Sequence, residues 1–192
     1  MVDVLSRERP AEDTRTHADV SIQAGGTAVN VALAAVRAGA AATVVGRVGS
    51  GPAAELVLAT LAQHDVEARL ARDPVLRTGA AVSLGTSVVA DRGANAALDV
   101  ADLPDPLAAD ALFVSGFALL QSGSADAAAA ALTQFRGDLA AVDLASPKLA
   151  RDAELAGIAA NVIFATSEEA RAVTGCSPED AARALREHFE IV

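Results

Sequence analysis

Short apolar runs alternate with segments of helical periodicity through the second half of the chain. Such runs predict buried strands, and apolar residues that recur every three or four positions predict amphipathic helices. In chain order the predicted strands and helices of this half are 111–114, 125–135, 139–144, 161–165, 167–173 and 178–188. Strands joined by helices favour a parallel sheet, because each parallel connection needs a crossover that a helix usually supplies. The sequence therefore predicts a doubly wound, mainly parallel α/β fold.

The first half of the chain continues this alternation and adds a hairpin. Residues 1–19 are polar and read as irregular, and residues 189–192 look like the beginning of another buried strand. Gly85 suits the first position of a type II′ turn, which predicts a hairpin. The elements expected in this half are a strand at 18–23, a helix that begins near 29 and stops at Gly39, a strand at 42–48, a helix at 52–63 and two hairpin strands at 78–84 and 87–91.

The composition excludes several classes of function. Fifteen Lys and Arg against 25 Asp and Glu give a net charge of −10. That charge argues against a nucleic-acid or anionic-membrane partner, since either needs a basic face. The one cysteine, Cys176, excludes a disulfide framework and, with three histidines, argues against a dedicated zinc site. The charged N-terminus lacks a signal-peptide segment and no run of about 18 apolar residues occurs, so we expect a cytoplasmic protein.

A pair of glycines stands where the first predicted helix begins. Gly25 and Gly26 belong to the segment Ala24-Gly25-Gly26-Thr27-Ala28-Val29-Asn30. Glycine lets the backbone approach a ligand closely, and the free N–H groups of a helix start can bind hydroxyl or phosphate oxygens. The amide of Asn30 would add a donor and an acceptor. The alternative interpretation is a plain turn followed by an alanine-rich helix.

Further motifs follow the diglycine segment in a fixed order. They are Ala38-Gly39-Ala40, Val45-Gly46-Arg47-Val48-Gly49, Thr78-Gly79, Gly93-Ala94-Asn95, Thr166-Ser167-Glu168-Glu169-Ala170 and Val173-Thr174-Gly175. This ordered set resembles the ribokinase (PfkB) family of carbohydrate kinases. The resemblance covers most of the chain, but only about the first two thirds of a typical family member.

The resemblance implies a ribokinase-like α/β core and a small β lid that covers the sugar. The segments near 14–24 and 76–91 look like lid strands, and we expect residues 1–192 to form a single, incomplete domain of this kind. The resemblance also implies ATP and Mg²⁺ as cofactors and a small-molecule sugar as the substrate. Lids of this kind can pair between subunits, which implies a possible homodimer.

Five residues match functional positions of the family. Asp3 matches the aspartate that holds sugar hydroxyls, and Gly25, Gly26 and Asn30 match the sugar-binding loop. Glu169 matches the glutamate that organises magnesium and phosphate through water. A carboxylate suits a hard cation that keeps several of its waters. From local sequence alone, the favoured interpretation of Asp3 and of Glu169 is a solvated surface carboxylate.

Departures from the family pattern concern the chemistry itself. The Gly-Ala-Gly-Asp signature, whose aspartate accepts the proton of the sugar hydroxyl in the family, does not occur in this sequence. Thr166 replaces the asparagine of the Asn-x-x-Glu motif. The family segments that hold adenine follow the part matched here, and the family's first strand precedes Met1, so we expect a chain truncated at its C-terminus and at its N-terminus. No catalytic residue can therefore be named.

The leading hypothesis is a carbohydrate kinase of the ribokinase/PfkB type that transfers a phosphoryl group from ATP to a sugar hydroxyl. This chain lacks the catalytic C-terminal segment, and the isolated 192 residues are expected to be inactive. The alternative is a non-catalytic sugar-binding or dimerisation module derived from such a kinase. A third possibility is a remnant that does not fold stably. No side chain selects one sugar, and the absence of Trp and Tyr gives little support to a nucleoside substrate.

Overall fold

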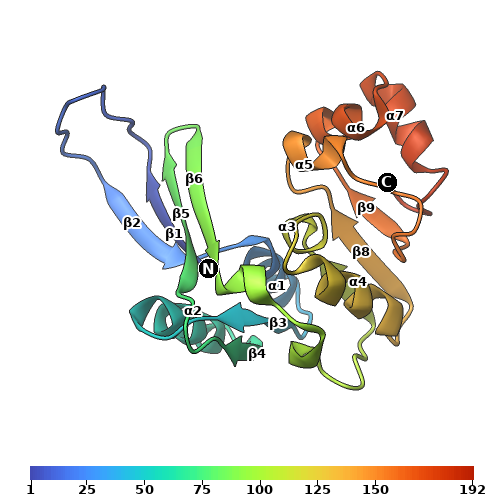
Figure 1. Cartoon of the computed structure of the whole chain (residues 1–192), viewed down its shortest axis with the longest axis horizontal. Helices are drawn as coiled ribbons and strands as arrows, with labels where there is room; N and C mark the ends of the chain where they lie inside the picture. The colour runs from blue at the N-terminus through green and yellow to red at the C-terminus, as the bar shows by residue number, and fades with distance from the viewer. The chain divides into compact units, whose positions relative to one another are not determined.

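The computed structural model describes all residues, 1–192, and they form two compact units, Met1–Ala97 and Leu98–Val192 (Figure 1). The first contains β1 (Val2–Ser6), β2 (Val20–Ala24), α1 (Thr27–Arg37), β3 (Thr43–Val48), α2 (Pro52–Gln63), β4 (Glu67–Arg72), β5 (Thr78–Leu84), β6 (Ser87–Gly93) and the 3-10 helix η1 (Ala94–Ala97). The second contains η2 (Val100–Asp102), β7 (Ala111–Val114), α3 (Gly116–Leu119), α4 (Ala125–Gln134), β8 (Leu139–Asp143), α5 (Pro147–Arg151), β9 (Val162–Phe164), α6 (Ser167–Thr174) and α7 (Pro178–Leu185).

The first unit contains a four-stranded sheet in the order β2-β1-β5-β6, called the lid sheet below. Strand β1 pairs antiparallel with β2 and parallel with β5, and β5 forms an antiparallel hairpin with β6. Gly85 has a φ of +58° at the tip of that hairpin, as a type II′ turn requires at its first position. Figure 1 shows the two hairpins of the sheet extending beyond the helices of this unit.

The rest of the first unit is a parallel pair, β3 and β4, packed with α1 and α2. Leu61 and Val57 of α2 are almost completely buried and pack against Val29 of α1 and Val44 of β3. The same core includes Val2 of β1, so the first strand of the lid sheet is anchored in it.

The link between β4 and β5 is held by buried polar contacts. Asp73 accepts hydrogen bonds from the backbone N–H groups of Val75 and Leu76 at 2.9 and 2.7 Å, and from Arg47 Nε at 3.0 Å. These bonds lower the pKa of the Asp73 carboxyl, the Leu76 bond contributing most and the Arg47 contacts adding to them. Thr78 Oγ1 accepts from the backbone N–H of Gly49 at 3.1 Å. The turn is thereby fixed against the end of β3.

The second unit is built on a parallel sheet in the order β7-β8-β9. Its core gathers Val142 of β8 and Ile163 of β9 with Leu132 of α4 and Leu185 of α7. Ile191 forms a parallel bridge with Val162, so residues near 191 begin to pair beside β9. No helix of either unit combines the length and the hydrophobicity that crossing a bilayer requires.

Most predicted elements are confirmed, with three differences. Residues 2–6 are a strand in the interior of the lid sheet, whereas the sequence predicted an irregular opening segment. Strand β4 was not predicted, because Glu67, Arg69 and Arg72 interrupt any apolar run. The short helices α3 and α5 were also missed. The segments predicted for the lid do lie in one sheet, as β2, β5 and β6.

Candidate functional site

The Asp3 carboxylate lies directly against the backbone of Gly25. A Cβ atom built on Gly25 would stand 1.9 Å from Asp3 Oδ2, so only glycine leaves room for this carboxylate. The Gly25 N–H donates to the carbonyl oxygen of Met1 at 3.0 Å, which ties the end of β2 to the start of β1. Asp3 is half-buried and its side chain makes no hydrogen bond within the chain. Its oxygens are therefore open to a ligand that donates hydrogen bonds.

Helix α1 begins immediately after the diglycine. Gly26 is the residue before its first turn, with a φ of +95°, and no side chain caps the helix there. The N–H groups of the first helical turn have no partner inside a helix. Asn30 lies one turn along α1; its side chain is exposed and makes no hydrogen bond within the chain. The start of α1 thus offers donors beside the acceptor supplied by Asp3.

Glu169 lies in the second unit, in the first turn of α6. Its Oε2 accepts a hydrogen bond from the backbone N–H of Thr166 at 2.8 Å, and Thr166 Oγ1 accepts from the Glu169 N–H at 3.2 Å. This reciprocal capping box explains why a threonine followed three residues later by glutamate begins a helix here. The other oxygen of Glu169 has no hydrogen-bond donor in the chain, so it can reach a cation through water.

A second carboxylate of this unit, Asp143, was not singled out by the sequence. It ends β8 and accepts a short hydrogen bond from the backbone N–H of Gly116, at the start of α3. Burial raises the pKa of Asp143, and the nearby charge of Glu169 raises it further, while bonds from the Gly116 and Ala145 backbones oppose the shift. The one available signal was its position at the carboxyl end of a predicted parallel strand, where α/β proteins place their ligands.

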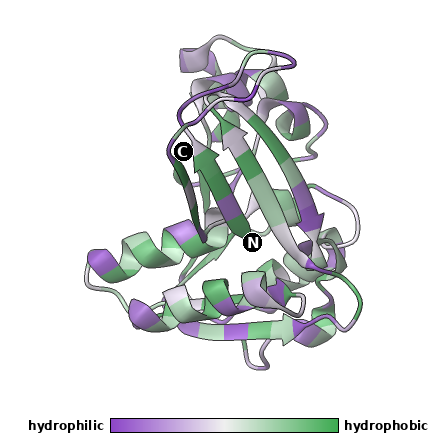
Figure 2. Ribbon diagram, turned by 90° about the vertical axis from the view of Figure 1, so that its left-hand side faces the viewer, coloured by the Kyte–Doolittle hydropathy of each residue, from purple (hydrophilic) through white to green (hydrophobic).

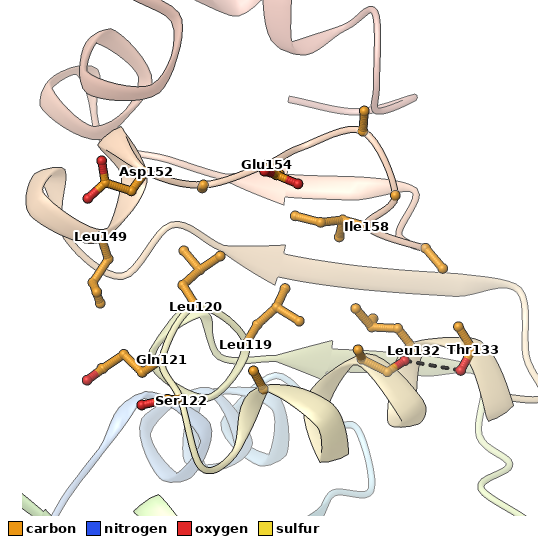
Figure 3. Close-up of a pocket in the computed structure, with 16 residues that line it drawn as sticks. Leu119, Leu120, Gln121, Ser122, Leu132, Thr133, Leu149, Asp152, Glu154 and Ile158 are labelled. Atoms are coloured by element: carbon orange, nitrogen blue, oxygen red, sulfur yellow. Dashed lines mark hydrogen bonds between the residues drawn. The ribbon is translucent and has the colours of Figure 1, made fainter.

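A groove of about 590 Å³ lies in the second unit between α4 and the segment that leads from α5 to β9 (Figure 3). Leu120, Leu132 and Ile158 form much of its apolar lining, and Asp152 and Glu154 are its charged residues. No Lys or Arg lines it, so the groove does not fit a nucleotide triphosphate. None of the five predicted site residues lines it either.

A comparison with protein families matches residues 1–191 to the pfkB family carbohydrate kinase. The chain belongs to this family. The resemblance seen in the sequence motifs is therefore confirmed over nearly the whole chain. No curated protein sequence matches this one.

Solved structures with the same fold include fructokinases and an aminoimidazole riboside kinase. A fructokinase from Vibrio cholerae O395, with fructose, ADP and calcium bound, has a TM-score of 0.77 at 25% identity over 97% of this chain. A fructokinase from Xylella fastidiosa with bound ATP has a TM-score of 0.78 at 19% identity over 100% of this chain and 67% of its own length. An aminoimidazole riboside kinase from Salmonella enterica has a TM-score of 0.75 at 17% identity, covering 98% of this chain and 65% of its own. The chain spans 64% of the Vibrio cholerae fructokinase.

These likenesses confirm the predicted ribokinase-like α/β fold with its small β lid. Of the predicted site residues, the structure brings together Asp3, Gly25 and Gly26, which touch one another or Met1, with Asn30 on the helix that follows. Glu169 belongs to the other unit. The roles predicted for all five residues stay predictions.

The two cofactors implied by the family fit the residues to different degrees. Mg²⁺ is commonly held by one or two carboxylates together with waters and phosphates. Glu169 fits that pattern, because one of its oxygens is unengaged and its charge lies near enough to Asp143 to help raise the pKa of that carboxyl. For ATP, the groove of Figure 3 lacks the positive charge that a triphosphate needs, since no Lys or Arg lines it.

Proposed function

We propose that this member of the pfkB family binds a neutral sugar through its first unit, as the sugar-recognition part of a carbohydrate kinase. The observation that carries the proposal is the open, half-buried carboxylate of Asp3 held against Gly25. A carboxylate beside a helix start that presents N–H donors suits neighbouring hydroxyl groups, which donate and accept at once. The fructose bound to the Vibrio cholerae relative supports a hexose as the first sugar to test.

In this proposal the chain's own residues bind and orient the acceptor sugar. Asp3 accepts hydrogen bonds from sugar hydroxyls, the diglycine lets the backbone approach the ring, and Asn30 binds a further hydroxyl. Bound Mg²⁺ would neutralise phosphate charge, and Glu169 would hold it through water. No residue among the 192 matches the family's proton acceptor, because the Gly-Ala-Gly-Asp signature is absent from this sequence.

Isothermal titration of the purified chain with fructose tests the sugar site. We expect binding without any nucleotide, and a loss of at least tenfold in Asp3→Asn, because a hydrogen bond to a charged group contributes more than one to a neutral group. Gln121→Ala is the control variant, because Gln121 lies in the other unit and should leave fructose binding unchanged. Absence of binding to every neutral sugar by a folded chain would contradict the proposal.

We further propose that these 192 residues alone turn over no sugar. A coupled assay that follows ADP release should stay at the rate of the enzyme-free control with fructose, ATP and Mg²⁺ present. Phosphoryl transfer depends on positioning and on electrostatic stabilisation of the phosphoryl group. The family's Gly-Ala-Gly-Asp signature, which supplies the proton acceptor, is absent from this sequence. Sugar-dependent turnover at the rate of ordinary kinases would contradict this part.

A second candidate role is dimerisation through the lid sheet. An exposed row of apolar side chains on one face of that sheet favours it. The register aligns Ile22, Val4, Val82 and Val89 in one row across all four strands. Ile22 is 63% exposed and Val89 75% exposed, so this row is uncovered. In Figure 2 hydrophobic residues predominate along these strands. Because the row spans the whole sheet, a second copy stacked face to face by a twofold axis would cover it.

The dimer is tested by sedimentation of the chain over a range of concentrations. We expect a dimer that Val89→Asp converts to a monomer, with Val88→Asp as the matched control, because Val88 lies on the opposite face of the same strand. A monomer at all concentrations, or equal effects of the two substitutions, would contradict the stacked dimer.

A further inference from the structure

Gln23 stands directly opposite Asp3 in the antiparallel pair of β1 and β2. Side chains directly opposite one another in such a pair share one face of the sheet, with Cβ atoms about 4.5–5.5 Å apart. Gln23 is exposed and makes no hydrogen bond within the chain. The Gln23 side chain thus begins next to that of Asp3 on one face of the sheet, and its amide has no partner within the chain.

Gln23 is the one polar side chain directly across from Asp3 on the neighbouring strands. On the other side of Asp3 the register places Ala81, which has no polar side-chain atom. Gly25 lies two residues after Gln23, just beyond the end of β2, and the Asp3 carboxylate lies against its backbone. Of the residues directly across from Asp3, Gln23 alone can donate a hydrogen bond from its side chain.

From this juxtaposition we infer that Gln23 is a specificity-determining residue of the sugar site. The inference rests on the proposed function. A carboxylate only accepts hydrogen bonds, whereas a carboxamide both donates and accepts. The pair therefore suits a vicinal diol: one hydroxyl donates to Asp3, and the neighbouring hydroxyl accepts from Gln23 Nε2 or donates to its Oε1.

The same pair disfavours an acidic substrate at this position. A sugar acid would bring its carboxylate against the charge of Asp3, and Gln23 carries no charge to compensate. The substrate class assigned to this part of the site is accordingly a neutral polyhydroxy compound with two adjacent free hydroxyls.

The test is isothermal titration with fructose and with its monodeoxy analogues. We expect Gln23→Ala to weaken fructose binding about threefold to tenfold, the usual effect of losing one neutral hydrogen bond. For the one analogue that lacks the hydroxyl bound by Gln23, the wild type and Gln23→Ala should bind equally. Gln23→Glu should weaken fructose binding more than Gln23→Ala does, since it adds a like charge opposite Asp3.

Ser21→Ala provides the matched control. Ser21 lies on the same strand and the same face, two residues further from the diglycine, and we expect this variant to bind fructose like the wild type. Wild-type binding with an unchanged Gln23→Ala variant would overturn this inference and leave the proposed function standing. An equal loss for every analogue would also overturn it, because it would indicate a disturbed strand. A folded wild type that binds no sugar would overturn both.

Discussion

Replacing Gly25 by alanine should weaken sugar binding strongly while leaving the fold almost unaffected. The new Cβ would lie 1.9 Å from Asp3 Oδ2 and 2.1 Å from Asp3 Cγ. Carbon and oxygen atoms need roughly 3.3 Å, so the carboxylate must move by about 1.4 Å. The displaced group is the end of a flexible side chain and not backbone, so the structure can accommodate the methyl group. A displacement above 1 Å costs a bound ligand its hydrogen bonds to that carboxylate, which are each worth about 1.5–3 kcal/mol.

The expected result is fructose binding weakened between about tenfold and a hundredfold, with a urea midpoint close to that of the wild type. Titration calorimetry and urea unfolding of the same preparation measure both quantities. Gly46→Ala is the matched control, since its Cβ would meet Leu70 Cδ2 at an ordinary 3.6 Å. Undiminished binding by Gly25→Ala would refute the reasoning, because it would mean that the position of Asp3 does not matter to the sugar.

Three further predictions concern stability. Gly116→Ala should lower the urea midpoint far more than Gly46→Ala does, since its Cβ would lie 2.2 Å from the Asp143 carbonyl oxygen, which is backbone; equal midpoints would be inconsistent with this contact. Thr166→Ala should lower the free energy of unfolding by about 1 kcal/mol through loss of the helix cap, and Thr166→Ser should restore most of it. Because the folded-state pKa of Asp73 is depressed, its ionised form stabilises the fold above the unfolded value of about 4, and that contribution disappears as the pH falls below it. The stability difference between wild type and Asp73→Asn should therefore shrink in urea titrations below about pH 4; a constant difference would contradict the assignment.

The regular part of the fold was predictable because its signals are local. Ser177, for example, accepts a hydrogen bond from the Asp180 N–H at the start of α7, as the serine before Pro178 indicated. Gly175 ends α6 with a φ of +72°, which is a conformation that glycine favours.

The elements that sequence reasoning missed depend on pairing between distant segments. Strand β1 contains Asp3 and Ser6, and its extended conformation comes from pairing with β2 on one side and β5 on the other. Strand β4 has no continuous apolar run, and its extended conformation comes from pairing with β3, where Thr43 Oγ1 donates to Glu67 Oε2 at 3.0 Å. Neither arrangement is visible in a single segment of sequence.

The candidate site likewise has one part that local sequence predicted and another that depends on contacts between distant segments. Gly25, Gly26 and Asn30 form a contiguous motif, so they could be identified along the chain. The close approach of Asp3 to Gly25 and the pairing of Asp3 with Gln23 depend on strand register, and the bond from Gly116 to Asp143 joins residues 27 positions apart. These contacts required the three-dimensional structure.

The central claim is that the sugar binds at Asp3 and the diglycine. An ¹⁵N-labelled sample titrated with fructose tests it directly, because glycine amides occupy a distinctive region of the amide spectrum. The account predicts that the largest shifts fall on Gly25, Gly26 and the first turn of α1, and that Asp3→Asn abolishes them. Shifts confined to the groove residues between Leu119 and Ile158, or no shifts at saturating fructose, would contradict it.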